Sequence, residues 1–388
     1  MKIRLLLISL CLSTGVTMAQ VTAKQLFGKT IGLLPALKYG PGDDRLGGAK
    51  MTYIDTCIVM QIMDSTKDDF IVQLSKNHRA FISRNNLQIV PDYIKPAYTL
   101  TSSWSVYGDN KYDYVNIGLD GKLPYSNIQE INPAKIVVDI FGATSNSNWI
   151  TQLRSVKEVK NAYYEQVDDD VFRVIIELKH NQHWGYFISY KKKSLSIRIK
   201  RQPEKLRIRN LKIAIDAGHG GSNTGATGLI SKVNEKDYTL KIAKGLESYL
   251  NKKHIQTVMT RNEDIDVGMV DRTTMLRQED PNILISIHLN SSSNENVRGP
   301  STYYRYIGFR PLTETILKRM LELKMGEFNN IGGFNFALSG PTEYPNCLVE
   351  VAFLSNAEDE KRILEPGFPK EVSRKIYKGI KDWLKEIK

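Results

Sequence analysis

Cysteine is scarce in this sequence, with three in 388 residues. Only Cys57 and Cys347 lie beyond the first twenty residues, and nearly three hundred residues separate them. No CxxC pair occurs, which excludes a zinc site built from paired cysteines. A disulfide framework of the kind that stabilises small secreted domains is also excluded, and we do not expect these two cysteines to be bonded.

Long apolar runs are missing except at the N-terminus. The segment MKIRLLLISLCLSTGVTMAQ has a basic start, an apolar core and small residues up to Ala19, which predicts a signal peptide over residues 1–19. No later run approaches the roughly 18 apolar residues that a membrane-spanning helix needs. We therefore expect a soluble mature protein without a membrane span, exported to the periplasm or cell envelope.

Acidic residues are fewer than basic ones, 42 against 54, which leaves a net charge of +12. The densest basic segment is Lys191–Arg209, with nine basic residues and one acid. Export argues against nucleic acid as the partner, so an acidic polymer of the cell envelope is one interpretation. A solvated strand edge that lysines protect from pairing explains the segment equally well.

The first two hundred residues contain little helical periodicity. Short segments with period-two alternation, such as DFIVQLSK, predict a small all-β barrel over residues 20–95. None of its residues suggests a catalytic role. Further alternating segments, such as KIVVDIFGA and VFRVIIELK, predict a second all-β domain over residues 96–204. His180 and His183 form an HxxH spacing there, but without a third ligand nearby we interpret them as surface histidines.

From Leu206 onward short apolar strands alternate with helical stretches. This alternation predicts an α/β catalytic domain over residues 206–388, with a mainly parallel central sheet flanked by helices. One helix is expected to follow Asn234 as its N-cap, with Asp237 completing a reciprocal cap. The chain is thus predicted to be multidomain, with two small all-β domains before the α/β domain.

The stretch KIAIDAGHGGSNTGATG has the glycines of a phosphate-binding loop but lacks its other residues. A dinucleotide fingerprint needs a third glycine where Asn223 stands. A P-loop needs a lysine where Ala226 stands. Nucleotide binding is therefore excluded.

Two histidines end apolar strands, His219 after KIAID and His288 in ILISIH. Because the carboxyl ends of parallel strands meet at one edge of a sheet, the two imidazoles are able to converge there. Two neutral imidazoles with one acid and water are suited to a catalytic zinc, and Glu235 is the natural third ligand. Taken singly, each histidine is better explained as a hydrogen-bonded structural residue, but two in equivalent positions with an acid between them favour the metal site.

Glu350 lies within the apolar segment CLVEVAF, which places a carboxylate in a central strand. Burial of an unpaired charge costs several kcal/mol, so a purely structural role is disfavoured. Beside a metal-bound water, Glu350 is suited to be the general base, with its pKa raised by burial. The alternative is an ion pair with an arginine such as Arg272.

Several motifs occur in the order and spacing of a known family. IDAGHGG, NEKD, TRNEDIDVGMVDRTTMLR, ISIHLN and LVEVAFLSN resemble zinc-dependent N-acetylmuramoyl-L-alanine amidases, over about residues 208–387. The resemblance implies one catalytic zinc ion bound by His219, Glu235 and His288, and Glu350 as the catalytic acid/base. Asn290 is a weaker candidate for contact with the substrate.

Two loop positions depart from the usual family pattern. Proline is commoner where Ala217 stands and aspartate where Asn223 stands, and we interpret both as loop variation that touches no ligand. The loop glycines are expected to let a bulky substrate approach the metal.

The earlier regions also carry resemblances. The segment DRLGGAKMTYIDTCIVMQIMDS with its continuation resembles bacterial Src-homology-type barrels. LPYSNIQEINPAKIVVDIFGA resembles the AMIN domain, a β-sandwich that targets envelope proteins to peptidoglycan. Together the resemblances imply hydrolysis of the amide between the lactyl group of N-acetylmuramic acid and L-alanine, in cell-wall turnover or daughter-cell separation.

Some regulated relatives have an extra helix that occludes the zinc. The run from Ser301 to Cys347 is short, so we expect no self-blocking helix here. Two other functions stay open at this point: a non-catalytic envelope-binding scaffold, and a zinc peptidase that cuts another amide.

Overall fold

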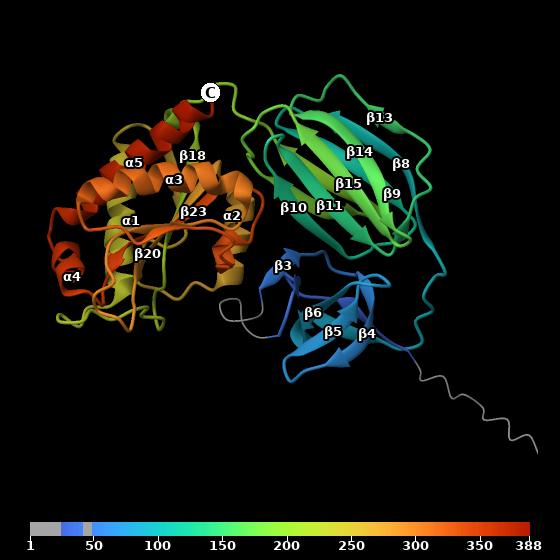
Figure 1. The fold of residues 1–388 in the computed structure, drawn as a ribbon, viewed down its shortest axis with the longest axis horizontal. Coiled ribbons are helices and arrows are strands. Elements are labelled where there is room, and N and C mark those ends of the chain that lie inside the picture. Colours follow the sequence, from blue (N-terminus) through green and yellow to red (C-terminus); the bar gives the residue numbers. More distant parts are fainter. Residues whose placement is uncertain (1–24, 42–48) are drawn as a thin grey trace, which may run out of the picture.

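The computed structural model describes residues 25–41 and 49–388, so the predicted signal peptide lies outside the described residues. Figure 1 shows a small β region in blue, a β-sandwich in green, and a region of helices and strands in yellow to red. The prediction of an all-β N-terminal part followed by a domain of helices and sheets is confirmed. Within the described ranges, no helix is both long and apolar enough to cross a membrane.

The N-terminal region is a seven-stranded antiparallel sheet with the strand order β3-β2-β6-β5-β4-β1-β7. Leu37, Val72 and Ile82 are fully buried, as the alternating pattern requires. Its assignment as a Src-homology-type barrel stays a prediction. The strands are β1 (Leu26–Thr30), β2 (Ala36–Lys38), β3 (Lys50–Tyr53), β4 (Val59–Ser65), β5 (Asp69–Gln73), β6 (Arg79–Ser83) and β7 (Leu87–Val90).

The second region is a sandwich of two sheets. One has the order β10-β11-β15-β14 and the other β12-β8-β9-β17-β16, with β13 also paired to β8. Trp104 of one sheet and Phe172 of the other meet edge to face with ring centroids 5.8 Å apart. The strands are β8 (Thr99–Gly108), β9 (Tyr112–Leu119), β10 (Tyr125–Glu130), β11 (Lys135–Phe141), β12 (Ala143–Thr144), β13 (Ile150–Gln152), β14 (Val159–Asp168), β15 (Val171–Leu178), β16 (Tyr186–Lys191) and β17 (Ser194–Lys200).

The basic segment Lys191–Arg209 begins at the turn between β16 and β17 and continues through β17. Lys191, Lys192 and Lys193 are exposed there. Further along, Lys200 pairs with Asp280 at 2.7 Å, and Arg201 lies among buried groups. β17 itself lies between β9 and β16, so most of the segment does not guard a sheet edge. An anionic partner for the exposed lysines stays a prediction.

The C-terminal sheet has the order β19-β18-β20-β23-β21-β22. Its central pairs, β18 with β19, β18 with β20 and β20 with β23, are parallel, whereas β21 runs antiparallel to β23. The strands are β18 (Lys212–Ala217), β19 (Gln256–Met259), β20 (Ile283–Asn290), β21 (Ser301–Tyr303), β22 (Asn329–Ile331) and β23 (Asn346–Phe353).

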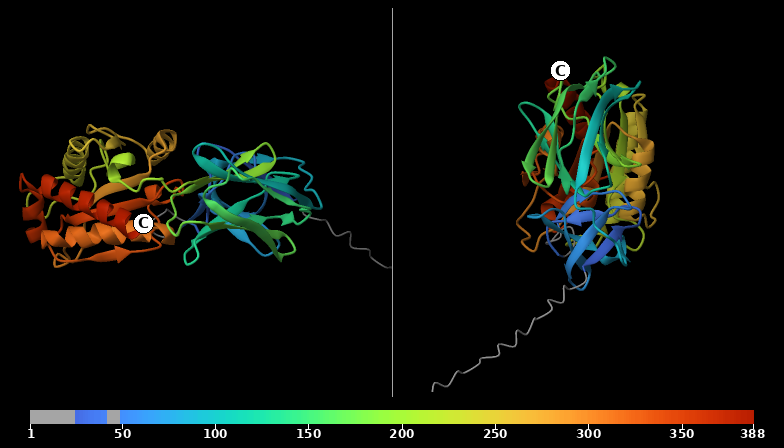
Figure 2. Two further views of the ribbon diagram at one scale, coloured as in Figure 1. Left: turned by 90° about the horizontal axis from the view of Figure 1, so that it is seen from above. Right: turned by 90° about the vertical axis from the view of Figure 1, so that its right-hand side faces the viewer.

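Helices cover both faces of this sheet, as the continuous apolar strands require. Ile213 and Ile215 of β18 pack in one core with Ile242 and Ile376, whereas the intervening Ala214 packs with Leu276 on the other face. Figure 2 shows helices on both sides of the sheet. They are α1 (Glu235–Asn251), α2 (Met269–Glu279), α3 (Arg310–Met320), α4 (Ala357–Ile363) and α5 (Phe368–Glu386).

The sandwich and the α/β region share a tightly hydrogen-bonded junction. The indole N–H of Trp383 donates to Gln182 at 3.0 Å, and the Gln182 amide donates to the carbonyl of Gly308 at 2.7 Å. The ring of Trp383 also packs on Trp184, with centroids 5.1 Å apart. These contacts fix the AMIN-like sandwich against the last helix and the segment before α3.

The interpretation of His183 as a surface residue is wrong. Its side chain is 1% exposed, and its Nε2 donates to the carbonyl of Glu130 at 2.8 Å. A Cβ at Gly308 would lie 2.4 Å from the His183 ring, so the ring fills the junction. His180 is the exposed member of the pair and contacts Glu158 at 2.8 Å. The HxxH spacing could not reveal this difference, because it depends on which region packs against the strand end.

We expect the junction to be acid-sensitive through His183. Burial lowers the pKa of His183 to about 4, although its bond to Glu130 opposes the shift. Above about pH 6.5 the ring is neutral in both folded and unfolded chains and contributes no pH dependence. As the pH falls toward 4, the unfolded chain binds the proton first, so the free energy of unfolding drops by about 3 kcal/mol.

Denaturant unfolding at several pH values, with His183→Gln beside wild type, measures this effect. The variant should lose that part of the acid slope, and His180→Gln should retain it. An unchanged slope in His183→Gln would contradict the prediction.

Candidate metal centre

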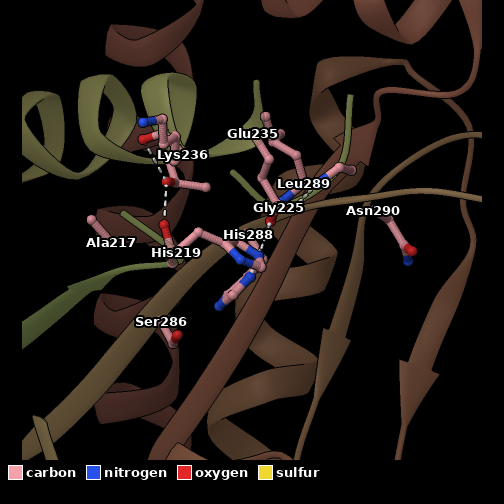
Figure 3. A network of polar contacts seen from close by, with 12 residues as sticks. Ala217, His219, Gly225, Glu235, Lys236, Ser286, His288, Leu289 and Asn290 are labelled. Atoms are coloured by element: carbon pink, nitrogen blue, oxygen red, sulfur yellow. Dashed lines mark hydrogen bonds and ion pairs between the residues drawn. The ribbon is translucent and has the colours of Figure 1, made fainter. Parts of the chain in front are cut away.

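Three side chains from separate elements meet at one edge of the C-terminal sheet. His219 follows β18, Glu235 begins α1, and His288 lies near the end of β20. The Nε2 atom of His219 and the Nδ1 atom of His288 each lie 3.1 Å from Oε1 of Glu235. The donor atoms of the three lie within 4.8 Å of one another, and Figure 3 shows the side chains clustered together. The structure thus brings together the three residues that the sequence nominated, and their role as ligands stays a prediction.

Parallel pairing explains why the two histidines converge. Ala217 of β18 lies opposite Ile287 of β20 in parallel register. His219 and His288 therefore emerge at the same edge, and their ring centroids are 5.0 Å apart. This edge, at the carboxyl ends of parallel strands, is where open α/β sheets place their sites.

The backbone holds the Glu235 carboxylate in place. Its Oε2 accepts from the amide of Ala226 at 2.8 Å, and its Oε1 accepts from the amide of Leu289 at 3.0 Å. Asn234 is the N-cap residue of α1 but its side chain makes no capping hydrogen bond, so the predicted reciprocal cap is wrong. The first helical residue instead turns back into the site.

The charges in this cluster favour a cation. Burial would raise the pKa of Glu235, but hydrogen bonds from the two histidines hold it well below its usual range. Burial would lower the pKa of His288, but Glu235, with the charges of Glu350 and Asp216, raises it to about 9. The site thus stabilises positive charge between the two rings.

Two loop glycines make room for the site's own side chains. A Cβ at Gly218 would lie 2.3 Å from the ring of His288. A Cβ at Gly225, whose φ is +68°, would lie 2.5 Å from the Glu235 carboxylate. The expectation that the glycines serve substrate approach is therefore incomplete, since these two are required by close packing inside the cluster.

A buried network behind the histidines was missed from the sequence. Asp216, 1% exposed, pairs with Arg272 at 2.6 Å and accepts from Thr260 and Ser286. The other end of the Arg272 guanidinium donates to the carbonyl of His219 at 2.6 Å. His219 has a φ of +61°, a conformation that costs a non-glycine residue free energy and that this network holds. The aspartate in IDAGHGG was the available signal.

Asn223 touches a site residue, contrary to the expectation of neutral loop variation. Its Oδ1 lies 2.9 Å from Nδ1 of His219. A partner on one ring nitrogen fixes the tautomer and orientation in which the other nitrogen faces Glu235. Asn223 therefore orients His219, as an aspartate at this position would.

Glu350 lies in β23 opposite His288 in parallel register. It is 7% exposed, and every residue of its strand is buried. Its side chain lines the same cavity as the three clustered residues. The guanidinium of Arg272 is engaged with Asp216 and with the carbonyls of Ala217, His219 and Val267 instead.

Asn290 lies at the end of β20 and also lines the cavity. Its side-chain amide donates to the hydroxyl of Tyr303 at 3.3 Å. Figure 3 shows it apart from the histidine–glutamate cluster. Its contact with a substrate stays a prediction.

The cavity has a volume of about 600 Å³, and both polar and apolar side chains line it. Asn223 and Asn290 are among the polar residues, and Met269, Phe336 and Leu338 are among the apolar ones. Between α3 and β23 the structure has β22 and short 3-10 turns but no α-helix. No helix from this segment fills the cavity, which agrees with the expectation of no self-blocking helix.

Comparisons with known proteins can now be set beside this geometry. The family model of N-acetylmuramoyl-L-alanine amidase matches residues 213–382, and that of the AMIN domain matches residues 105–208. The germination-specific N-acetylmuramoyl-L-alanine amidase of Bacillus subtilis is 30% identical over 187 residues, which cover 43% of this chain and 77% of the relative. This chain belongs to the N-acetylmuramoyl-L-alanine amidase family.

Other amidases extend the comparison. N-acetylmuramoyl-L-alanine amidase AmiC of Escherichia coli O6:H1 is 25% identical over 367 residues, covering 71% of this chain and 87% of the relative. The structure of the catalytic domain of CwlV, an amidase from Bacillus (Paenibacillus) polymyxa, shares 30% identity, with a TM-score of 0.43, over 46% of this chain and 99% of that domain. The part that matches the amidase family contains all five nominated residues: His219, Glu235, His288, Asn290 and Glu350.

Proposed function

We propose that this chain is a zinc-dependent N-acetylmuramoyl-L-alanine amidase. It hydrolyses the amide between the lactyl group of N-acetylmuramic acid and L-alanine in peptidoglycan, for cell-wall turnover or daughter-cell separation. The observation that carries the proposal is the cluster of His219, Glu235 and His288 in one cavity with Glu350. Membership of the amidase family supports the choice of substrate.

The donor set fits one zinc ion. Two imidazole nitrogens and one carboxylate are ligands that catalytic zinc takes, and zinc bonds of about 2.0–2.1 Å place tetrahedral ligand atoms roughly 3.3 Å apart. Here the closest donor atoms are 3.1 Å apart, and all lie within 4.8 Å. When bound, zinc lowers the pKa of a water ligand to about 7 and polarises a carbonyl group.

Glu350 is the proposed catalytic acid/base. Its place opposite His288 puts a carboxylate beside the ligand cluster, on a strand that packing holds rigid. Glu350 takes the proton of the attacking water and gives it to the departing amine of L-alanine as the amide bond breaks. Arg272 and Asn223 fix the position of His219 through hydrogen bonds to its backbone carbonyl and to its ring. Asn290, which lines the cavity, contacts the substrate.

The regions before the catalytic domain are assigned to export, to binding or spacing, and to envelope targeting. We assign residues 1–19 to a signal peptide, 20–95 to a Src-homology-like barrel, 96–204 to an AMIN-like sandwich and 206–388 to the catalytic domain. The AMIN family match supports a periplasmic or envelope protein that binds peptidoglycan.

Digestion of purified sacculi with the mature protein, followed by mass spectrometry of the products, tests the proposal. Free stem peptides are expected, without an added activator. Shortened stems would show a peptidase instead. An inert protein that carries no zinc after purification would show a non-catalytic scaffold.

We expect the apolar residues that line the cavity to contribute to substrate binding through Phe336. Its ring packs on His288, with centroids 6.5 Å apart, and lines the cavity. The sugar and stem peptide have no aromatic ring, so the expected contribution is apolar burial, and about 40 Å² of the ring covered by substrate gives roughly 1 kcal/mol. Phe336→Ala should therefore raise KM about three- to tenfold with kcat nearly unchanged.

Steady-state kinetics on soluble peptidoglycan fragments measure this effect. Phe328→Ala is the matched control, because Phe328 packs on Phe353 and is not among the residues lining the cavity. A fall in kcat without a change in KM for Phe336→Ala would contradict the binding role.

A further inference from the structure

One wall of the cavity is formed by a segment with almost no regular secondary structure of its own. We call residues 332–340 the wall segment; it contributes Asn335, Phe336, Ala337 and Leu338 to the cavity lining. Apart from one 3-10 turn, Ala337–Ser339, it has no regular structure. Its position therefore depends on contacts with other elements.

Aromatic packing holds the side of the wall segment that faces the site. The rings of Phe334 and Phe336 have centroids 4.2 Å apart, and both pack on Tyr303 of β21, at 5.1 and 5.5 Å. The backbone N–H of Phe334 also donates to the carbonyl of Tyr304 at 3.2 Å, so the start of the wall segment is held by residues next to β21.

Arg305 joins the wall segment to the N-terminal sheet. Its Nη1 donates to the side-chain oxygen of Asn335 at 2.6 Å. Its Nη2 donates to the carbonyl of Lys50 and to that of Met51, the latter at 3.2 Å, both in β3. The guanidinium thus bridges two parts of the chain that are more than 250 residues apart, with one end on the cavity lining.

The far end of the wall segment meets the same N-terminal sheet. A Cβ at Gly340 would lie 3.2 Å from the ring of Tyr53, the last residue of β3. The hydroxyl of Tyr306 donates to the carbonyl of Gly340 at 2.8 Å. Strand β3 therefore contacts the wall segment at Gly340 and, through Arg305, at Asn335.

We propose that Arg305 is a positioning residue through which the N-terminal sheet holds the wall segment in its substrate-binding position. The N-terminal sheet then completes the substrate site in addition to any role in targeting. A guanidinium is required, because its fork of donors serves Asn335 and two carbonyls together, which a lysine ammonium cannot do in the same geometry. The inference rests on the proposed amidase function.

Kinetics of the full mature chain on a soluble fragment, N-acetylmuramic acid carrying its stem peptide, test the proposal. Arg305→Ala should raise KM about tenfold and leave kcat within about twofold, because loss of positioning weakens ground-state and transition-state binding alike. Arg305→Lys should fall between wild type and Arg305→Ala. Arg310→Ala is the control, since Arg310 makes an exposed pair with Glu314 on α3.

A binding measurement separates positioning from catalysis. In a Glu350→Gln background, calorimetry should show Arg305→Ala weakening the binding of the same fragment about tenfold, with zinc content unchanged. Adding Phe336→Ala should weaken binding by less than the product of the two single effects, because both substitutions act on one wall.

Three outcomes would overturn the proposal. The first is an unchanged KM in Arg305→Ala. The second is an equal loss of kcat in both Arg305 variants together with a lowered melting temperature. The third is strictly multiplicative effects of Arg305→Ala and Phe336→Ala on binding. Failure of the amidase function is distinguishable, because wild type would then release no free stem peptide from sacculi.

Discussion

Glu350→Gln is expected to lower the rate of amide cleavage by about a thousandfold while zinc stays bound. Proton transfer by a positioned side chain contributes about 10²–10⁴-fold, and glutamine can neither take nor return the proton. The substitution keeps the shape of a side chain that is 7% exposed in a fully buried strand, so the fold should be retained.

Turnover of sacculi or soluble fragments, with zinc measured on the same preparation, checks this result. Glu327→Gln is the matched control, because Glu327 is an exposed carboxylate of the same region. Wild-type turnover in Glu350→Gln would show that another group moves the proton.

Glu235→Gln is expected to weaken zinc binding by more than about a hundredfold and to abolish activity with it. Loss of a residue that hydrogen-bonds a zinc ligand already lowers metal affinity or activity about 10–100-fold. Here the anionic ligand itself is neutralised. Glu235 also faces both histidines at 3.1 Å, so its charge sets the electrostatics of the whole cluster.

Competition with a chelator, followed by metal analysis, measures the affinity. Glu247→Gln on the same helix is the control, since that residue lies three turns further along α1 and outside the cavity. Excess zinc should restore part of the activity of Glu235→Gln. Undiminished affinity in the variant would mean that the third ligand is another residue.

The site residues were readable from the sequence because their signals are local. A histidine that ends an apolar strand, and a glutamate that begins a helix, are visible within a few residues of sequence. The alternation of strands and helices then places them at one edge of a sheet, where the structure finds His219, Glu235 and His288 together. The motif resemblance supplied the roles.

The wrong interpretations share a different origin. His183 was assigned to the surface and Asn223 to neutral loop variation, but one fills a junction beside Gly308 and the other holds the ring of His219. The side chain of Asn234 makes no capping hydrogen bond, and Glu235, the first residue of α1, contributes its carboxylate to the site. The environment of His183 depends on which distant segment packs against it, and the other two contacts depend on how one loop folds back on itself, and periodicity carries neither kind of information.

By itself the sequence determined the two all-β regions, the α/β region and the residues able to hold a metal, since these follow from side-chain period and residue type. Only the tertiary structure decided how they act together. The Asp216–Arg272 network behind the histidines and the Arg305 link from β3 to the wall segment join residues 56 and more than 250 positions apart. Such contacts form because packing brings remote segments within hydrogen-bond distance, and no local pattern of one sequence encodes that distance.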